Sequence, residues 1–158
     1  GDDAGPEPGI PDAAEVAVMA WQDWAKAVDF TPAASERTVY CLGNCREGGA
    51  ACGYAGTIDT YALVRGRQTL LDYKTGKAIY PEAFLQLVAY RHAAARAGVL
   101  NEQETAEMLV LRLPKTLEDP AFEAQPVPED GTGGLADFLA AKRLWAWSRR
   151  MQGLEVGS

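Results

Sequence analysis

The stretch YAGTIDTYALVRGRQTLLDYK, residues 54–74, decides the fold that we expect. Two runs of apolar, β-branched and aromatic residues, 54–64 and 68–74, flank a short Arg-Gly-Arg turn. This pattern predicts two antiparallel strands joined by a tight turn. The second run ends in Asp72 and Lys74, whose side chains lie on the same side of a strand because side chains alternate with period 2. The pair is either a structural salt bridge or part of a working site.

The segments around this hairpin complete a mixed α/β pattern. ERTVYCL at 36–42 predicts a strand ahead of the glycine-rich loop 43–53, so that three strands form a meander. TPAAS at 31–35 predicts a break before that strand. Pro81 and Gly98 bound a predicted helix, in keeping with the preference for proline at the start of helices and glycine after their end. We also expect a helix after Asp12, with a capping box to Glu15. Its apolar stripe is Val16, Ala20, Trp24 and Val28. Strands at 107–114 and 122–128 and a last helix at 134–151 complete the expected elements.

Length and composition predict one globular domain over residues 1–158. Apolar residues make up 47% of the chain and charged residues 23%, which is the balance of a soluble folded protein. No apolar run approaches the roughly 18 residues of a membrane helix, so we expect no membrane partner. Three cysteines, an odd number, favour a reducing compartment and a cytoplasmic location. We expect the polar residues 1–11 to be flexible, and the first residue, Gly1 rather than Met, leaves open that further residues precede the chain.

The net charge is −7, but the charges are unevenly distributed. Residues 31–100 carry eight Lys and Arg against five Asp and Glu, a local excess of +3. The overall acidity disfavours tight non-specific binding to DNA, because phosphate contacts need Lys and Arg. It does not exclude a metal-dependent enzyme, whose ions attract phosphate themselves.

Three carboxylates fall on neighbouring strands of the predicted meander. Glu36 opens the first strand, Asp59 lies within the second, and Asp72 ends the third beside Lys74. Unpaired charges in apolar surroundings are costly, and crowded carboxylates repel one another unless a cation holds them. Oxygen ligands of this kind suit Mg²⁺ or Mn²⁺. A lysine beside such an ion can orient water and balance the charge that develops on phosphate, which is the chemistry of phosphodiester hydrolysis.

The order of motifs also resembles a known family. GTID with Asp59, DYK at 72–74 and QLVAY at 86–90 are similar to the G-x-x-D, D-x-K and Q-x-x-x-Y series of the PD-(D/E)xK nuclease superfamily, in its RecB-type and phage exonuclease branch. The resemblance covers roughly residues 36–96. It implies a restriction-endonuclease-like core, a central mixed β-sheet flanked by helices. It also implies a metal-dependent deoxyribonuclease, an exonuclease in phage or prophage DNA recombination, repair or processing, in a bacterial or phage-infected cell.

The resemblance assigns roles to individual residues. Asp59 and Asp72 are metal ligands together with the backbone carbonyl of Tyr73, and Lys74 is the catalytic lysine. Glu36 matches the acidic residue ahead of the first core strand, as a further ligand of Mg²⁺ or Mn²⁺. Gln86 and Tyr90, four residues apart on one helix face, hold the DNA. Four basic residues near the motifs are either phosphate contacts or solvated turn residues: Arg65, Arg67, Lys77 and Arg91, of which we assign Lys77 and Arg91 to the substrate.

Two features depart from the family pattern. Many RecB-type members carry a histidine upstream of the first acidic residue, whereas the single histidine here, His92, follows the Q-x-x-x-Y motif. Iron–sulfur relatives use one upstream cysteine and three near the C-terminal end, whereas Cys41, Cys45 and Cys52 all lie ahead of Asp59. This placement rules out that cluster. A zinc site without an obvious fourth ligand, a Cys41–Cys52 disulfide and free thiols remain as alternatives.

Other functions stay open at this point. The chain can be a non-catalytic DNA-binding or assembly subunit that keeps the nuclease fold, or a nuclease that acts on RNA. A homo-oligomer or a phage recombination partner is compatible with the resemblance. Trp145 and Trp147 are either packing residues or a platform on which bases stack.

Overall fold

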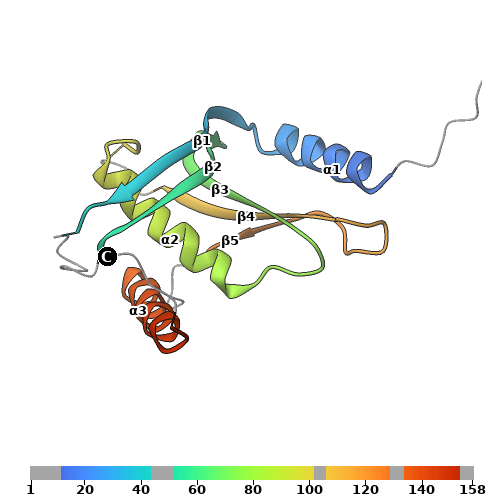
Figure 1. The fold of residues 1–158 in the computed structure, drawn as a ribbon. Helices are drawn as coiled ribbons and strands as arrows, with labels where there is room; N and C mark the ends of the chain where they lie inside the picture. Colours follow the sequence, from blue (N-terminus) through green and yellow to red (C-terminus); the bar gives the residue numbers. More distant parts are fainter. Residues whose placement is uncertain (1–11, 44–51, 102–105, 129–133, 154–158) are drawn as a thin grey trace, which may run out of the picture.

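The structure is a computed structural model that describes residues 12–43, 52–101, 106–128 and 134–153. The segment 1–11, expected to be flexible, and Cys45 lie outside these ranges. The elements follow the predicted order, helix, three strands, helix, two strands and helix (Figure 1). They are α1 (Ala13–Ala27), β1 (Thr31–Cys41), β2 (Tyr54–Val64), β3 (Arg67–Thr75), α2 (Pro81–Arg96), β4 (Glu107–Leu113), β5 (Glu123–Pro126) and α3 (Leu135–Met151).

The five strands form one mixed sheet in the order β1-β2-β3-β4-β5. The first three strands are an antiparallel meander, as predicted, and β5 runs antiparallel to β4. β4 is parallel to β3, and α2 provides the crossover that a parallel pair needs. The chain is thus an α/β protein with a mixed sheet flanked by three helices, and β3 is its central strand.

The predicted break at 31–35 is wrong, because β1 already begins at Thr31. Pro32 cannot donate a hydrogen bond, but β1 is an edge strand, where proline is tolerated. The pairing with β2 shifts register between Pro32 and Ala34, which accommodates the irregular start.

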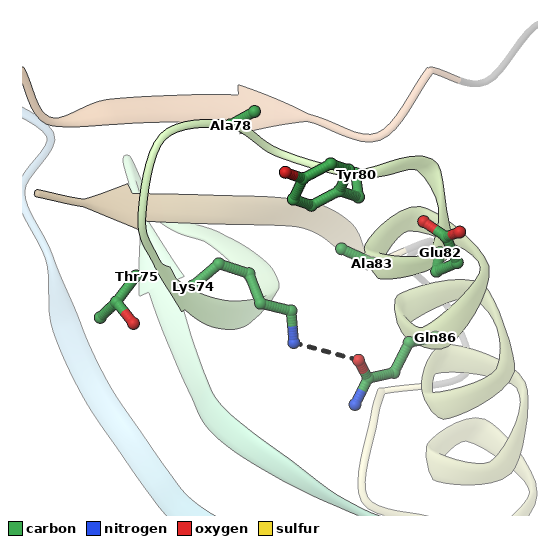
Figure 2. A pocket seen from close by; sticks show the side chains of 7 residues that line it. All are labelled: Lys74, Thr75, Ala78, Tyr80, Glu82, Ala83 and Gln86. Atoms are coloured by element: carbon green, nitrogen blue, oxygen red, sulfur yellow. Dashed lines mark hydrogen bonds between the residues drawn. The ribbon is translucent and has the colours of Figure 1, made fainter. Parts of the chain in front are cut away.

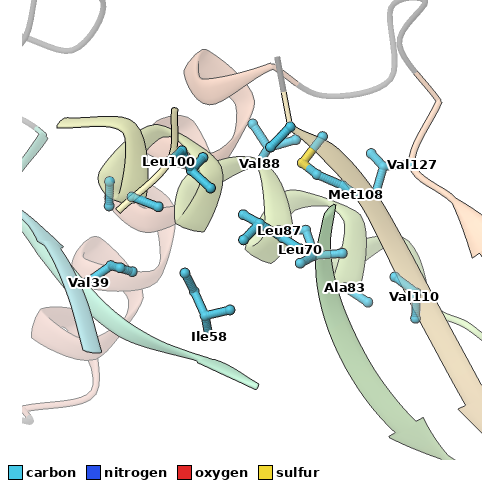
Figure 3. Close-up of a cluster of buried hydrophobic side chains, with 13 residues drawn as sticks. Val39, Ile58, Leu70, Ala83, Leu87, Val88, Leu100, Met108, Val110 and Val127 are labelled. Atoms are coloured by element: carbon cyan, nitrogen blue, oxygen red, sulfur yellow. The ribbon is translucent and has the colours of Figure 1, made fainter. Parts of the chain in front are cut away.

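The core lies on both faces of the sheet. On one face α2 packs against the strands through Leu87, with Ile58 and Leu70 beneath it (Figure 3). On the other face Leu71 packs among the aromatic rings that α1 and the following residues supply; these are Trp21, Trp24 and Phe30. β3 is buried continuously from Gln68 to Asp72, as expected of a strand covered on both faces.

The capping box of α1 is present, with Asp12 Oδ1 accepting from the Glu15 amide at 2.9 Å. The predicted stripe is partly wrong, because Val16 is 36% exposed and Ala17 is buried instead. α3 lies against α2, and Phe138 meets Tyr54 edge to face at 4.9 Å between ring centroids. Across the described residues, none of the helices has the length and apolar character to cross a membrane.

Candidate active site

Asp72 and Lys74 lie side by side at the end of β3, as the alternation of side chains predicts. Asp72 is 2% exposed, although it is charged. The Lys74 Nζ atom donates to Asp72 Oδ1 at 3.0 Å and lies 2.8 Å from Oδ2. The lysine is more than one-third exposed, so the pair joins a buried carboxylate to an ammonium group at the surface.

The same lysine connects β3 to α2. Its Nζ atom donates to Gln86 Oε1 at 3.2 Å, and Gln86 Nε2 donates to the Tyr90 hydroxyl at 2.8 Å. Figure 2 shows the Lys74 side chain reaching from the strand towards Gln86 on the helix. One continuous chain of polar contacts therefore runs from Asp72 through Lys74 and Gln86 to Tyr90.

The ring of Tyr90, a residue of α2, packs against β2 at Gly56, the glycine of the GTID segment. A Cβ atom added at Gly56 would stand 2.7 Å from both Cζ and OH of Tyr90, and closer still to Cε1. No side chain fits in that space, so the ring can rest on the strand only where the residue is glycine. This contact accounts physically for a glycine three residues before Asp59.

Asp59 is held beside the end of β3. Its Oδ2 atom accepts a hydrogen bond of 2.9 Å from the backbone amide of Tyr73. The register pairs between β2 and β3 run from Val64↔Arg67 to Thr60↔Leu71. The hydrogen bond from Tyr73 to the Asp59 side chain links the two strands just beyond the last of these pairs. The two aspartates that the sequence assigns to the site thus sit on adjacent strands, next to each other.

Burial raises the pKa of Asp72 above its ordinary value, because desolvation penalises the ionised carboxylate. The hydrogen bond and the charge of Lys74 oppose this shift, while the negative charge of Asp59 adds to it. The Oδ2 atom is buried and has no hydrogen-bond partner, although the ammonium lies close to it. An additional cation would relieve both the desolvation and the repulsion between the aspartates.

Oxygen donors of this kind fit a hard divalent ion. Asp72 offers a buried carboxylate, whose Oδ2 atom lies 2.8 Å from the Lys74 ammonium, and Asp59 offers a second carboxylate from the next strand. Mg²⁺ and Mn²⁺ are commonly bound through one or two carboxylates, with water completing the shell. Asp59 and Asp72 are therefore the residues of this site that could hold such an ion.

Glu36 lies near this pair but is not gathered with it. It sits in β1 between the register pairs Ser35↔Thr60 and Arg37↔Ile58, which places it across from Asp59. Its backbone has a positive φ of 50°, a local irregularity in the strand, and its side chain is exposed. Within the described ranges, Glu36, Asp59 and Asp72 do not form a group whose ligand atoms all lie within 4.8 Å of one another.

The remaining residues assigned from the sequence have different surroundings. Tyr73 directs its ring to the opposite face, into the cluster around Leu71. Arg91 Nη1 donates to the Ala106 carbonyl at 3.4 Å, a contact that ties α2 to the start of β4. Lys77 is exposed. The backbone hydrogen bond from Lys115 holds the pKa of Asp119 below its usual range, and the charge of Lys77 adds a smaller effect in the same direction.

Arg67 and the two tryptophans of α3 have contacts or exposure of their own. Arg67 forms an ion pair of 2.8 Å with Glu107, at the far end of β3. Trp145 and Trp147 are 58% and 53% exposed on α3, and the guanidinium of Arg149 lies 5.7 Å from the Trp145 ring centroid.

A pocket of about 320 Å³ opens beside Lys74, between the end of β3 and the first turns of α2 (Figure 2). Lys74 and Gln86 form part of its wall. Glu82 and Tyr80, which the sequence motifs do not single out, also line it. Tyr80 ends the short connection between the D-x-K strand and the Q-x-x-x-Y helix, and Glu82 lies in the first turn of that helix. Their positions between the two motifs could have drawn attention to them. The Lys74 side chain therefore borders an open space.

None of the protein-family models that were compared with the chain matches it, and no curated protein is similar enough to count as a match.

Proposed function

We propose that the chain is a Mg²⁺- or Mn²⁺-dependent deoxyribonuclease with a restriction-endonuclease-like core. The observation that carries the proposal is the continuous network of Asp72, Lys74, Gln86 and Tyr90, which ends on Gly56. All three motifs of the resemblance contribute to this network or, through Asp59, to its metal side. A structural ion pair alone would need neither the glutamine nor the close approach of Tyr90 to β2.

In the proposed reaction each residue has a separate task. Asp59 and Asp72 hold the ion, which when bound supplies activated water and charge stabilisation. Lys74 has three donors, and its contacts to Asp72 and Gln86 leave capacity for one further acceptor in the adjoining pocket. That acceptor is a phosphate oxygen or the attacking water. Gln86 fixes the ammonium from the helix side, and Tyr90 fixes Gln86.

The preference for DNA ends, and the setting in phage or prophage recombination, repair or processing, rest on the motif resemblance alone. The same holds for a homo-oligomer or a recombination partner. The cytoplasmic location rests on the odd number of cysteines together with this resemblance. Because the net charge of −7 disfavours general attraction of DNA, substrate binding would depend on the metal ions and on local basic residues such as Lys77.

The test is a cleavage assay on end-labelled linear DNA and closed circular DNA, each single- and double-stranded, with a matched RNA. It is run with Mg²⁺, Mn²⁺ or EDTA. We expect metal-dependent loss of the linear DNA only. Cutting of circles would keep the site and make the protein an endonuclease, and preference for RNA would change the substrate. No cleavage by folded wild-type protein with either metal would contradict the proposal and favour a non-catalytic DNA-binding subunit.

A further inference from the structure

A second group of chemistry-bearing residues lies outside the carboxylate site. Cys41 ends β1, Cys52 precedes β2 and His92 belongs to α2. The two Sγ atoms are 2.9 Å apart, and His92 Nε2 lies 4.0 Å from Cys41 Sγ and 3.9 Å from Cys52 Sγ. In the part of the chain that the structure describes, this is the group of three potential metal ligands whose donor atoms all lie within 4.8 Å of one another.

The sequence spacing did not reveal this group, because His92 is 40 residues beyond Cys52. The structure supplies the missing donor by packing α2 against the end of the β1–β2 hairpin. Cys41 and Cys52 are 3% and 0% exposed, and His92 is half-buried. Three donors from three segments therefore meet at one protected point.

The donor set is that of zinc rather than of magnesium. Thiolate sulfur and imidazole nitrogen are preferred zinc ligands, whereas Mg²⁺ takes oxygen. With Zn–S distances of about 2.3 Å and Zn–N distances of about 2.0 Å, tetrahedral geometry separates the ligand atoms by roughly 3.5–3.8 Å. The two sulfur–nitrogen distances of 4.0 and 3.9 Å are close to this, and the sulfur atoms would move apart to admit the ion.

The oxidation state of the cysteines decides whether an ion can enter. Cys41 is a free thiol, whereas Cys52 is disulfide-bonded in the structure. Reduction by a dithiol or a phosphine breaks that S–S bond with two electrons and two protons, and the reductant is oxidised. Each thiol then loses its proton as it binds the metal, because the thiolate is the ligand.

We propose that the chain, with its thiols reduced, binds one Zn²⁺ ion through Cys41, Cys52 and His92. The three residues leave one coordination position for a further ligand or water. The ion joins the end of the hairpin to α2. Its ligand His92 is two residues beyond Tyr90, and its ligand Cys52 is four residues before Gly56. The Tyr54 hydroxyl, which donates to the Ala89 carbonyl at 2.8 Å, already links the same two segments. The proposal does not depend on the nuclease function.

Metal binding by the reduced, metal-free chain tests the proposal. The full chain is purified with EDTA and a phosphine reductant, freed of EDTA and titrated with Zn²⁺, and in parallel with Co²⁺ as a spectroscopic probe of thiolate ligation. We expect one ion per chain, a thiolate-to-cobalt charge-transfer band, and a higher melting temperature with Zn²⁺. Cys41→Ser and Cys52→Ser should each weaken the band, and His92→Ala should lower the affinity at least tenfold.

Asp72→Asn is the matched control, because it removes the oxygen site and leaves the sulfur site. We expect it to keep the cobalt band and the zinc stoichiometry. A folded, reduced wild-type chain without the band would overturn the proposal. So would zinc binding that Asp72→Asn abolishes and Cys41→Ser leaves intact. If a cysteine variant does not fold, the wild-type spectrum and the His92→Ala titration still decide.

Discussion

The ring of Tyr90 rests on the backbone of Gly56, at a distance that leaves no room for a side chain on that strand residue. The contact joins α2 to β2, while Gln86 and Lys74 join α2 to β3. The helix is therefore fixed to both strands that carry the aspartates. Displacement of Tyr90 should therefore change the position of the Lys74 ammonium, to which it is linked by two hydrogen bonds through Gln86.

Gly56→Ala should destabilise the fold by about 1–3 kcal/mol, the usual cost of overpacking, and should lower cleavage. The physical reason is that the new methyl group must push the Tyr90 ring away from Gln86. Urea denaturation measures the change. Gly53→Ala is the control, because a Cβ atom there would meet nothing within 4 Å. In a Tyr90→Ala background the cost of Gly56→Ala should shrink; an unchanged cost would mean that the ring is not the cause.

Gln86→Ala should lower kcat/KM by about tenfold to a hundredfold, because a hydrogen bond to a charged group contributes ~1.5–3 kcal/mol. Gln86 is a positioning residue that acts through the Lys74 ammonium. The fall should appear mainly in kcat, while the melting temperature changes little. Gln22→Ala, on the exposed side of α1, is the matched control. A loss confined to KM would assign Gln86 to substrate binding instead.

Stability without metal should depend on pH through Asp72. Its raised pKa means that the folded chain holds this proton more tightly than the unfolded chain does. The favourable contribution is complete below the usual aspartate range and is lost as the pH rises through the raised pKa. In EDTA, Asp72→Asn should therefore melt at a higher temperature than the wild type at neutral pH, with the gap closing as the pH falls. A gap independent of pH would contradict this.

Mg²⁺ or Mn²⁺ should stabilise the wild type, by about 2.7 kcal/mol when the ion is present at a hundred times its Kd. Asp72→Asn and Asp59→Asn should remove most of this effect. Glu36→Gln should weaken it less, because Glu36 is exposed and lies outside the pair of aspartates. Thermal melts across a metal titration measure all three variants. Equal losses in Glu36→Gln and Asp72→Asn would make Glu36 a full ligand.

Much of the site geometry follows from local periodicity. The i, i+2 spacing places Asp72 and Lys74 on one side of a strand, and the i, i+4 spacing places Gln86 and Tyr90 on one side of a helix. The structure confirms both placements and connects them by a hydrogen bond. The order of helices and strands is likewise predictable, since turns, proline and glycine mark the ends of the elements.

Features that depend on how elements dock were not predictable. His92 reaches Cys41 and Cys52 because α2 packs on the hairpin, and no spacing rule connects residues so far apart. The contact of Tyr90 with Gly56 has the same origin. The early start of β1 was missed because Pro32 normally interrupts a strand, and its tolerance at a sheet edge appears only once the strand order is known.

The most direct measurement is hydrolysis of linear duplex DNA by the wild type and by Lys74→Ala, with Mn²⁺ and with EDTA. Lys26→Ala, an exposed lysine of α1, is the control for loss of a surface charge. We expect cleavage by the wild type and by Lys26→Ala with Mn²⁺ only, and a loss of at least a hundredfold in a Lys74→Ala protein that remains folded. Cleavage by Lys74→Ala at the wild-type rate, or cleavage that persists in EDTA, would contradict the proposed site.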